Sequence, residues 1–120
     1  EKFNKQCNIP LGIKYLKLGC NNQYIIDSLP NSVAELELDH DFSLEINNLP
    51  TSIKKLVICK TSWYNKDLNC LPDYVEKLQL NYRYAKRISN IPSNLKKLIC
   101  HIDYAYKDDF AMCVVIETYE

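Results

Sequence analysis

Glycine is scarce in this chain of 120 residues, in which Gly12 and Gly19 are the only two. Turns must therefore depend on Asn, Asp and Ser, whose short polar side chains hydrogen-bond to nearby turn backbone. Such residues occur in pairs, at Asn21-Asn22, Asn47-Asn48 and Ser89-Asn90. The shortage of glycine also leaves no glycine-rich loop of the kind that cradles phosphates.

The sequence has no net charge and no long apolar run. Its 15 basic and 15 acidic residues cancel, whereas nucleic-acid-binding proteins carry a basic excess that displaces counterions from phosphates. No apolar run approaches the roughly 20 residues of a transmembrane helix, and the start at Glu1 shows neither a signal peptide nor an initiator methionine. We therefore expect a soluble, cytoplasmic piece of a longer protein that binds neither nucleic acid nor a membrane.

The cysteines lack the close spacing of a metal or redox site. Six are present, but no Cys-x-x-Cys occurs, and the closest pair, Cys59 and Cys70, is 11 residues apart. This spacing argues against a zinc ribbon and against a thioredoxin-like site. A disulfide scaffold stays open, although such scaffolds serve small chains that build little core of their own. We favour reduced, mostly buried thiols.

All five prolines follow one period. They stand at steps of 20, 20, 22 and 20 residues, and each follows Ile or Leu: Pro10, Pro30, Pro50, Pro72 and Pro92. The clearest copy spans residues 49–58, with the sequence Leu-Pro-Thr-Ser-Ile-Lys-Lys-Leu-Val-Ile. Self-similarity at a fixed short period indicates a repeat architecture.

Apolar residues recur at fixed distances from each proline. The third, sixth and eighth following positions are apolar in every copy, as in Ile53, Leu56 and Ile58. A further apolar column lies four residues before the later prolines, at Ile26, Ile46, Leu68 and Ile88. The frame is L-x-x-L-x-L, the core of a leucine-rich repeat, in which each unit supplies one short strand and buries its apolar side against its neighbours.

The local pattern favours strands over helices. Apolar residues alternate with polar ones, as in Leu36-Glu37-Leu38, which is the period of a strand, and the preceding proline disfavours a helix. We predict a right-handed leucine-rich-repeat solenoid whose concave face is a parallel sheet of about five strands, with extended segments, turns or 3-10 helix on its convex side. The strands are expected at residues 15–18, 35–38, 55–58, 77–80 and 97–100, with a C-terminal capping strand near residues 113–118. Residues 1–120 then form one domain, in which residues 105–120 are the cap.

An aromatic column accompanies the repeats. Phe42, Tyr64 and Tyr84 each lie eight residues before the next proline, and Tyr104 lies where a sixth repeat would place the same column. These side chains are expected in the core on the far side of the coil. Asn22 interrupts the column in the first repeat, where Tyr24 is expected to substitute.

The third repeat is two residues longer than the others, near residues 60–64, and the single tryptophan, Trp63, lies in this insertion. Insertions in solenoids map to loops. Trp63 therefore either fills the gap that the longer loop creates or takes part in binding.

The frames at residues 49–56 and 91–98, Leu-Pro-Thr-Ser-Ile-Lys-Lys-Leu and Ile-Pro-Ser-Asn-Leu-Lys-Lys-Leu, resemble FNIP repeats. These are the leucine-rich repeats of social amoebae and of giant DNA viruses of amoebae. The frame is also similar to the 20-residue leucine-rich repeats of bacterial effectors. The resemblance covers residues 3–104, and the Phe-Asn of the family name is present as Phe3-Asn4, with Phe42-Ser43 as a degraded copy.

The resemblance implies a module that binds other proteins. In giant viruses such arrays often follow an F-box, where they look like substrate receptors for host ubiquitin ligases. The 120 residues contain no F-box, so that role is implied by the family alone.

Strand alternation predicts which side chains face outward from the concave sheet. At the fifth, seventh and ninth positions after each proline they are Tyr15, Lys17 and Gly19; Glu35, Glu37 and Asp39; Lys55, Val57 and Cys59; Lys77, Gln79 and Asn81; and Lys97, Ile99 and His101. All except Gly19, Cys59 and Asn81 are candidate partner-binding residues. His40, Trp63, Tyr82 and Tyr106 are expected at the rim of this face, where aromatic side chains anchor partners.

The charges of the predicted face are divided. The second strand is acidic, and Lys55, Lys77 and Lys97 form a ladder with steps of about 4.8 Å. We interpret the face as a docking surface for a protein of complementary charge. The alternative is a solvated face on which Glu35 and Glu37 neutralise Lys55 and Lys17.

The area of the predicted face is small. Five strands and four exposed residues along each give roughly 300 Å², whereas a standard interface buries about 800 Å² per partner. Either the loops join the interface, or the natural array is longer, or binding is weak.

No arrangement in the sequence is typical of catalysis or metal binding. Cys59, Asn81 and His101 share an outward position and are the residue types of a papain-like site, but two strand spacings separate Cys59 from His101 by roughly 9.6 Å. Asp39, His40 and Asp41 do not converge, because neighbours on a strand point to opposite faces. We therefore expect that the chain is not an enzyme and that it binds no metal, cofactor or small-molecule substrate. A cysteine-dependent hydrolase is kept as a third hypothesis.

The leading hypothesis is a non-catalytic protein-interaction module, the substrate-recognition part of a viral or amoebal ubiquitin-ligase adaptor of the F-box type. The alternative is a structural or assembly role, in which arrays stack end to end or decorate a particle.

Overall fold

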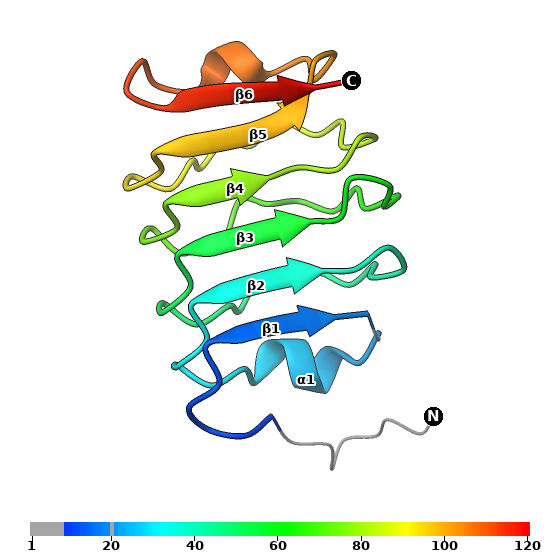
Figure 1. Cartoon of the computed structure of the whole chain (residues 1–120), viewed down its shortest axis with the longest axis vertical. Coiled ribbons are helices and arrows are strands. Elements are labelled where there is room, and N and C mark those ends of the chain that lie inside the picture. The colour runs from blue at the N-terminus through cyan, green and yellow to red at the C-terminus, as the bar shows by residue number, and fades with distance from the viewer. Residues whose placement is uncertain (1–8, 20) are drawn as a thin grey trace.

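The computed structural model describes residues 9–19 and 21–120, which coil into a solenoid with a six-stranded parallel sheet along one side (Figure 1). The strands follow one another in sequence order across the sheet: β1 Tyr15–Leu18, β2 Glu35–Leu38, β3 Lys55–Ile58, β4 Lys77–Gln79, β5 Lys97–His101 and β6 Val115–Tyr119. The predicted leucine-rich-repeat coil is confirmed. Its overall extents are 42 × 25 × 20 Å.

The strand boundaries differ slightly from the prediction. β4 ends one residue early and β5 one residue late. The capping strand β6 begins at Val115 and pairs in parallel with β5, with Val115 beside Lys97. Directly after β4, the Leu80 N–H still donates to the carbonyl oxygen of Ile99 at 2.8 Å.

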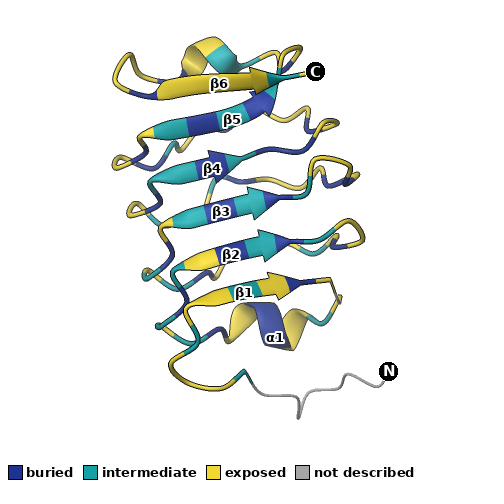
Figure 2. Cartoon of the chain, in the orientation of Figure 1, coloured by how far each residue is buried: buried dark blue, intermediate teal, exposed yellow. Residues whose placement is uncertain are grey.

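The apolar frame forms the core. Leu36, Leu56, Leu78 and Leu98 lie in register on neighbouring strands and are fully buried. Figure 2 shows buried and half-buried residues alternating along the central strands. Burying a leucine side chain stabilises the fold by roughly 1.5–3 kcal/mol, so the repeated column holds the coil together.

Each proline opens a β-turn that leads into the next strand. The carbonyl oxygens of Pro30, Pro50, Pro72 and Pro92 accept hydrogen bonds from the N–H three residues later, at 3.1–3.3 Å. Ser32 and Ser52 lie within two of these turns, and their hydroxyls donate to the carbonyl oxygens of Ile13 and Val33 at 2.7 Å. The serine of the repeat therefore ties one turn to the preceding coil, a role that the apolar pattern did not predict.

The aromatic column is buried as predicted, at Phe42, Tyr64, Tyr84 and Tyr104. The three tyrosine hydroxyls donate to carbonyl oxygens of the preceding repeat, from Tyr64 to Leu44, from Tyr84 to Lys66 and from Tyr104 to Lys86, at 2.7–2.8 Å. Burial raises the pKa of all three hydroxyls. The column thus forms a hydrogen-bonded tyrosine ladder as well as a hydrophobic stack.

The prediction for Tyr24 is wrong. It lies on the short helix α1, Gln23–Asp27, and is 52% exposed. Asn22 caps this helix, because its side-chain oxygen accepts from the N–H groups of Tyr24 and Ile25. The helix buries Ile25 and Ile26 instead, since one helical turn replaces the extended segment that would present an aromatic side chain.

The C-terminal end of the coil is only partly closed. The 3-10 helix η1, Lys107–Asp109, precedes β6, and Phe110 and Val114 are buried beside it. Ile116, which lies in register with Leu98, is nevertheless 37% exposed, because no further strand of the described residues covers it. Within the described part of the chain, no helix has both the length and the apolar character needed to span a membrane.

Candidate functional site

The concave face carries the side chains that alternation places outward. Tyr15, Lys17 and Glu35 are exposed, and the other nine candidate residues are half-buried: Glu37, Asp39, Lys55, Val57, Lys77, Gln79, Lys97, Ile99 and His101. They come from β1 to β5, with Asp39 directly after β2. The face is therefore continuous across five strands.

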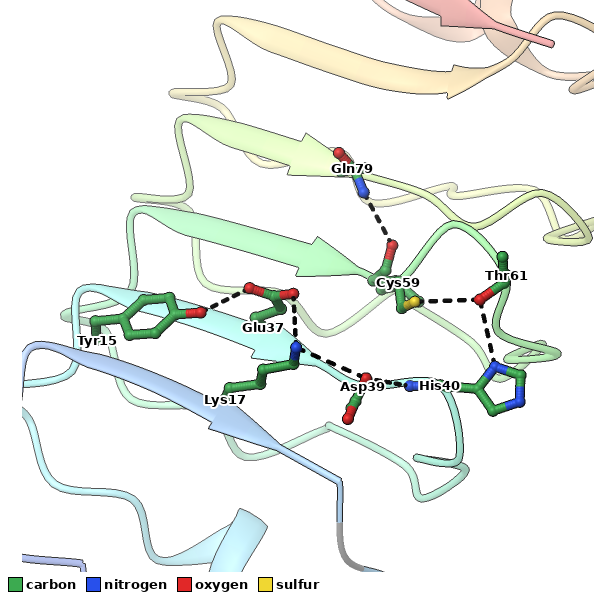
Figure 3. A network of polar contacts seen from close by, with 9 residues as sticks. Tyr15, Lys17, Glu37, Asp39, His40, Cys59, Thr61 and Gln79 are labelled. Carbon is green, nitrogen blue, oxygen red and sulfur yellow. Dashed lines mark hydrogen bonds and ion pairs between the residues drawn. The ribbon is translucent and has the colours of Figure 1, made fainter.

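A polar network covers the amino-terminal half of the face (Figure 3). The Tyr15 hydroxyl donates to Glu37 at 2.7 Å, and the Lys17 ammonium lies 3.7 Å from Glu37 and 3.9 Å from Asp39. The hydrogen bond to Glu37 raises the pKa of Tyr15. In this half, the lysine and tyrosine side chains pair with the carboxylates of the same face. This agrees with the alternative interpretation of a solvated face whose charges neutralise one another.

The other half of the face is cationic. Lys55, Lys77 and Lys97 lie in register on β3, β4 and β5, so the predicted ladder has neighbouring members. Lys97 pairs with Glu117 of β6 at 2.8 Å. The hydrogen bond and charge of Lys97 lower the pKa of Glu117, and Lys77 and Lys60 add to this effect. Within the described residues, Lys55 and Lys77 form no ion pair.

A group of aromatic and cationic side chains lies at the carboxyl ends of β3 to β6. We call it the edge cluster, and it consists of Lys60, Trp63, Tyr82, Arg83, His101 and Tyr119. The Arg83 guanidinium carbon lies 3.7 Å from the centre of the Trp63 ring, and the Lys60 ammonium 4.5 Å from the centre of the Tyr119 ring. The His101 ring lies between those of Tyr82 and Tyr119, at centroid distances of 4.6 and 5.8 Å. These contacts join the four strand ends into one surface.

All residues of the edge cluster except His101 line a cavity of about 340 Å³. Its walls are the rings of Trp63, Tyr82 and Tyr119 with the cations Lys60 and Arg83, and Thr61 and Glu120 complete the lining. The Tyr119 hydroxyl donates to the Leu80 carbonyl oxygen at 2.7 Å, and burial raises its pKa to about 12. That hydrogen bond fixes the ring as a wall of the cavity.

Asn81 positions the insertion that carries Trp63. The sequence places Asn81 outward on the concave face, but it is 1% exposed, and this prediction is wrong. Its amide nitrogen donates to the carbonyl oxygens of Ser62 and Tyr64, each at 2.9 Å, so the polar side chain turns inward to satisfy the longer loop. With its neighbours Ser62 and Tyr64 buried, Trp63 faces solvent and is 68% exposed.

The predicted rim residues divide between two places. Trp63 and Tyr82 belong to the edge cluster, and His40 lies beside it, with its Nδ1 atom 3.3 Å from the Thr61 hydroxyl (Figure 3). Tyr106 instead packs against Tyr104 and the Arg87 guanidinium. It therefore lies with the buried aromatic column.

Sequence reasoning missed Lys60, Arg83 and Tyr119. Lys60 and Arg83 follow the third and fourth strands, at the tenth and eleventh positions after Pro50 and Pro72. Extending the outward positions past the strand ends would have found Arg83, at the eleventh position, but not Lys60, at the tenth. Tyr119 has no such signal, because only the register of β6 brings it beside His101.

Cys59 and His101, two of the residues considered for a papain-like site, have other polar neighbours. The Cys59 sulfur lies 3.4 Å from the Thr61 hydroxyl, whereas His101 Nδ1 accepts a hydrogen bond from the Asp103 N–H at 3.0 Å. Asn81 is turned into the core, so the three residues of the considered papain-like set do not come together. No group of three or more potential metal-ligating side chains occurs among residues 9–19 and 21–120.

The prediction of mostly buried thiols is wrong for the four cysteines within the described residues. All four are free, but Cys100 alone is buried, and burial raises the pKa of its thiol. Cys59 is half-buried, and Cys70 and Cys113 are exposed. Cys7 and Cys20 lie outside the described residues.

A coil of short repeats with one parallel sheet and an outward-facing strand surface defines a leucine-rich-repeat type of solenoid, a fold that generally mediates protein–protein interaction. The FNIP repeat family model matches residues 3–41, 21–60 and 64–101, and the chain belongs to this family. No curated protein and no solved structure gives a significant match.

Proposed function

We propose that the concave face binds another protein through its cationic half, formed by Lys55, Lys77 and Lys97. The observation that carries this proposal is the division of charge across one sheet. Glu37 of β2 and Asp39 directly after it are engaged by Tyr15 and Lys17, whereas Lys55 and Lys77 form no ion pair among the described residues. Adjacent like charges on neighbouring strands are destabilising, so a row of lysines is better explained by an acidic partner than by stability.

In the finer form of this proposal, the chain is the substrate-recognition part of a ubiquitin-ligase adaptor of the F-box type, from a virus of amoebae or an amoeba. The family resemblance supports this role. We place the protein in the cytoplasm, because free thiols such as Cys70 and Cys113 persist in a reducing compartment. The coding sequence upstream of Glu1 tests the adaptor role, and an upstream segment without an F-box contradicts it.

A charge-reversal experiment tests the binding face. The chain is immobilised and challenged with an amoebal lysate, and the captured proteins are quantified for the wild type and for the double variant K55E/K77E. The Lys97–Glu117 pair is left intact so that the sheet keeps that contact. We expect the double variant to lose at least nine-tenths of each specific partner, because two reversed charges repel an acidic surface.

The matched control is K66E/K86E, which makes the same change of net charge at two exposed lysines outside the sheet. It should capture the same proteins as the wild type, and thermal melting should stay within a few degrees for both variants. Undiminished capture by K55E/K77E would contradict the proposed face.

The alternative function is assembly, and one observation favours it. The outer edge of β6 is unpaired within the described chain, and Val115 and Ile116 are exposed there. Uncovered edge strands favour pairing with another chain. Sedimentation velocity over a hundredfold range of protein concentration tests for self-association. A monomer at every concentration would contradict the assembly function.

A further inference from the structure

The edge cluster contains two cations that the fold leaves without acidic partners. Among the described residues, neither Lys60 nor Arg83 forms an ion pair, although Glu120 shares the lining of their cavity. Arg87 makes the contrast clear, because its Nε and Nη2 atoms donate to the two Asp109 carboxylate oxygens at 2.8 and 3.1 Å. Arg83 is instead held by stacking on Trp63, which leaves its N–H donors free for a ligand.

The cavity walls define the chemistry of an occupant. Guanidinium and ammonium groups attract a carboxylate, and the rings of Trp63, Tyr82 and Tyr119 provide faces for an aromatic or large apolar group. A volume of about 340 Å³ lies at the lower end of the range for binding pockets. Tryptophan, tyrosine and arginine are also the residues that dominate binding energy at protein interfaces.

The cavity lies past the carboxyl end of a strand that carries a member of the lysine ladder. Lys77 begins β4, and Tyr82 of the cavity wall follows three residues after the strand ends at Gln79, so the chain between them spans at most roughly 17 Å. Between these two ends the face offers the half-buried side chains of Val57, Gln79 and Ile99. An extended peptide of about six residues, with the same rise per residue, reaches from the cavity to the ladder.

One carboxylate of the chain already lies in this field. Glu117 of β6 pairs with Lys97 at 2.8 Å, and its pKa is lowered chiefly by Lys97, with further effects of Lys77 and Lys60. Glu117 neutralises Lys97, whereas Lys60 and Lys77 form no ion pair among the described residues and keep their charges for the carboxylates of a partner.

We propose that the edge cluster binds an aromatic side chain of an extended acidic peptide, whose adjacent Asp or Glu pairs with Arg83 and Lys60, and whose further acidic residues lie over Lys77. This inference rests on the proposed function, since it needs the concave face to be a binding surface. Binding at the edge cluster also enlarges the small interface of the strand face, because the loops after β3 and β4 then contact the peptide.

Single-stranded nucleic acid also combines charge with stacking, but the observations favour a peptide. The cationic half of the face is bordered by Glu35 of β2, which lies in register with Lys55 and is exposed, and its charge repels a phosphate backbone that continues past the lysines. The net charge of the chain is zero, whereas nucleic-acid grooves carry a basic excess.

The test begins with selection of a random library of twelve-residue peptides, displayed on phage, against the immobilised chain. We expect enrichment of sequences with an aromatic residue beside Asp or Glu and a second acidic residue about five positions away. The strongest peptide is then synthesised with a fluorescein label, and its affinity is measured by anisotropy. Because Trp63 is the only tryptophan, the unlabelled peptide should also shift the intrinsic fluorescence of the wild type.

Three variants of the edge cluster are compared with a matched control. W63A and R83E should each weaken peptide binding at least tenfold, while R83K, which keeps the charge and loses the planar stack, should fall between R83E and the wild type. Y74A is the control, because Tyr74 is another exposed aromatic with a cation, Lys54, over its ring. It should bind as the wild type does. Circular dichroism checks that each variant is folded.

Peptide binding that is unchanged in both W63A and R83E would overturn this inference, as would selection without acidic and aromatic residues. Tighter binding of a fluorescein-labelled twelve-nucleotide oligothymidine would also overturn it. If K77E lowers peptide affinity and W63A does not, the edge inference fails while the concave-face proposal survives. If neither K77E nor W63A lowers peptide affinity, the edge inference and the concave-face proposal both fail.

Discussion

The side-chain amide of Asn81 donates to the carbonyl oxygens of Ser62 and Tyr64, each at 2.9 Å, and so fixes the insertion of the third repeat from the following repeat. We expect N81A to destabilise the fold by about 1–3 kcal/mol, because two buried carbonyl groups lose their donor. Urea denaturation followed by circular dichroism measures this change, and the emission maximum of Trp63 reports whether the loop has moved.

N94A is the control for N81A. The Asn94 amide also donates to a backbone carbonyl oxygen, that of Asp73 at 2.9 Å, but it is exposed. Its loss should change stability by no more than about 0.5 kcal/mol. Equal effects of the two variants would contradict a special role of Asn81.

The tyrosine ladder predicts a cost for removing a single hydroxyl. In the wild type the Tyr84 hydroxyl donates to the Lys66 carbonyl oxygen at 2.8 Å. Y84F leaves the ring in the core but removes this donor. Stability should fall by about 1 kcal/mol, measured by urea denaturation. Y82F removes the hydroxyl of an exposed tyrosine and should leave stability unchanged, so a loss in Y82F as large as in Y84F would argue against the ladder.

The same ladder predicts unfolding at alkaline pH. Burial raises the pKa of Tyr64, Tyr84 and Tyr104 above the unfolded value near 10. Their contribution to stability is therefore complete below pH 10 and is lost as the pH rises further, because the unfolded chain releases these protons first. Absorbance of tyrosinate at 295 nm and circular dichroism, recorded together from pH 9 to 12.5, should show these tyrosines ionising with unfolding. Full tyrosine ionisation in a chain that stays folded would contradict this.

The repeat core predicts that removing a core leucine costs more stability at the centre of the coil than at its end. Leu56 is fully buried, whereas its equivalent in the first strand, Leu16, is half-buried. L56A should cost about 2–5 kcal/mol, and L16A should cost clearly less because less apolar surface is lost. Thermal melts of the two variants make the comparison, and an equal or larger loss for L16A would contradict this prediction.

Exposure of the thiols predicts their reactivity. Cys70 and Cys113 are exposed and should react with iodoacetamide in the folded protein. Cys100 is buried with a raised thiol pKa and should react only after unfolding, because thiolate formation and access are both suppressed. Peptide mapping by mass spectrometry after labelling with and without urea measures both. Rapid native labelling of Cys100 would contradict its burial.

The repeat frame was predictable because every copy faces the same physical problem. A short unit buries its apolar side only against its neighbours, so Leu36, Leu56, Leu78 and Leu98 must share a position. The outward positions of the strands followed from strand alternation in the same way. Asn81 escaped this rule, because its side chain turns inward to satisfy the carbonyl groups of a longer loop, and no periodic pattern encodes that requirement.

The sequence by itself determined the solenoid, the order of its strands and the buried columns, because all of these repeat with the prolines. It also determined the division of charge on the concave face, because the residues concerned lie at outward strand positions counted from the prolines. Only the tertiary structure decided how Trp63, Arg83, Tyr82 and Tyr119 meet. These residues lie outside the repeated positions, and Tyr119 joins them through the pairing of β6 with β5. Residues that the copies do not share are placed by loops and by register, which depend on the whole coil rather than on any one repeat.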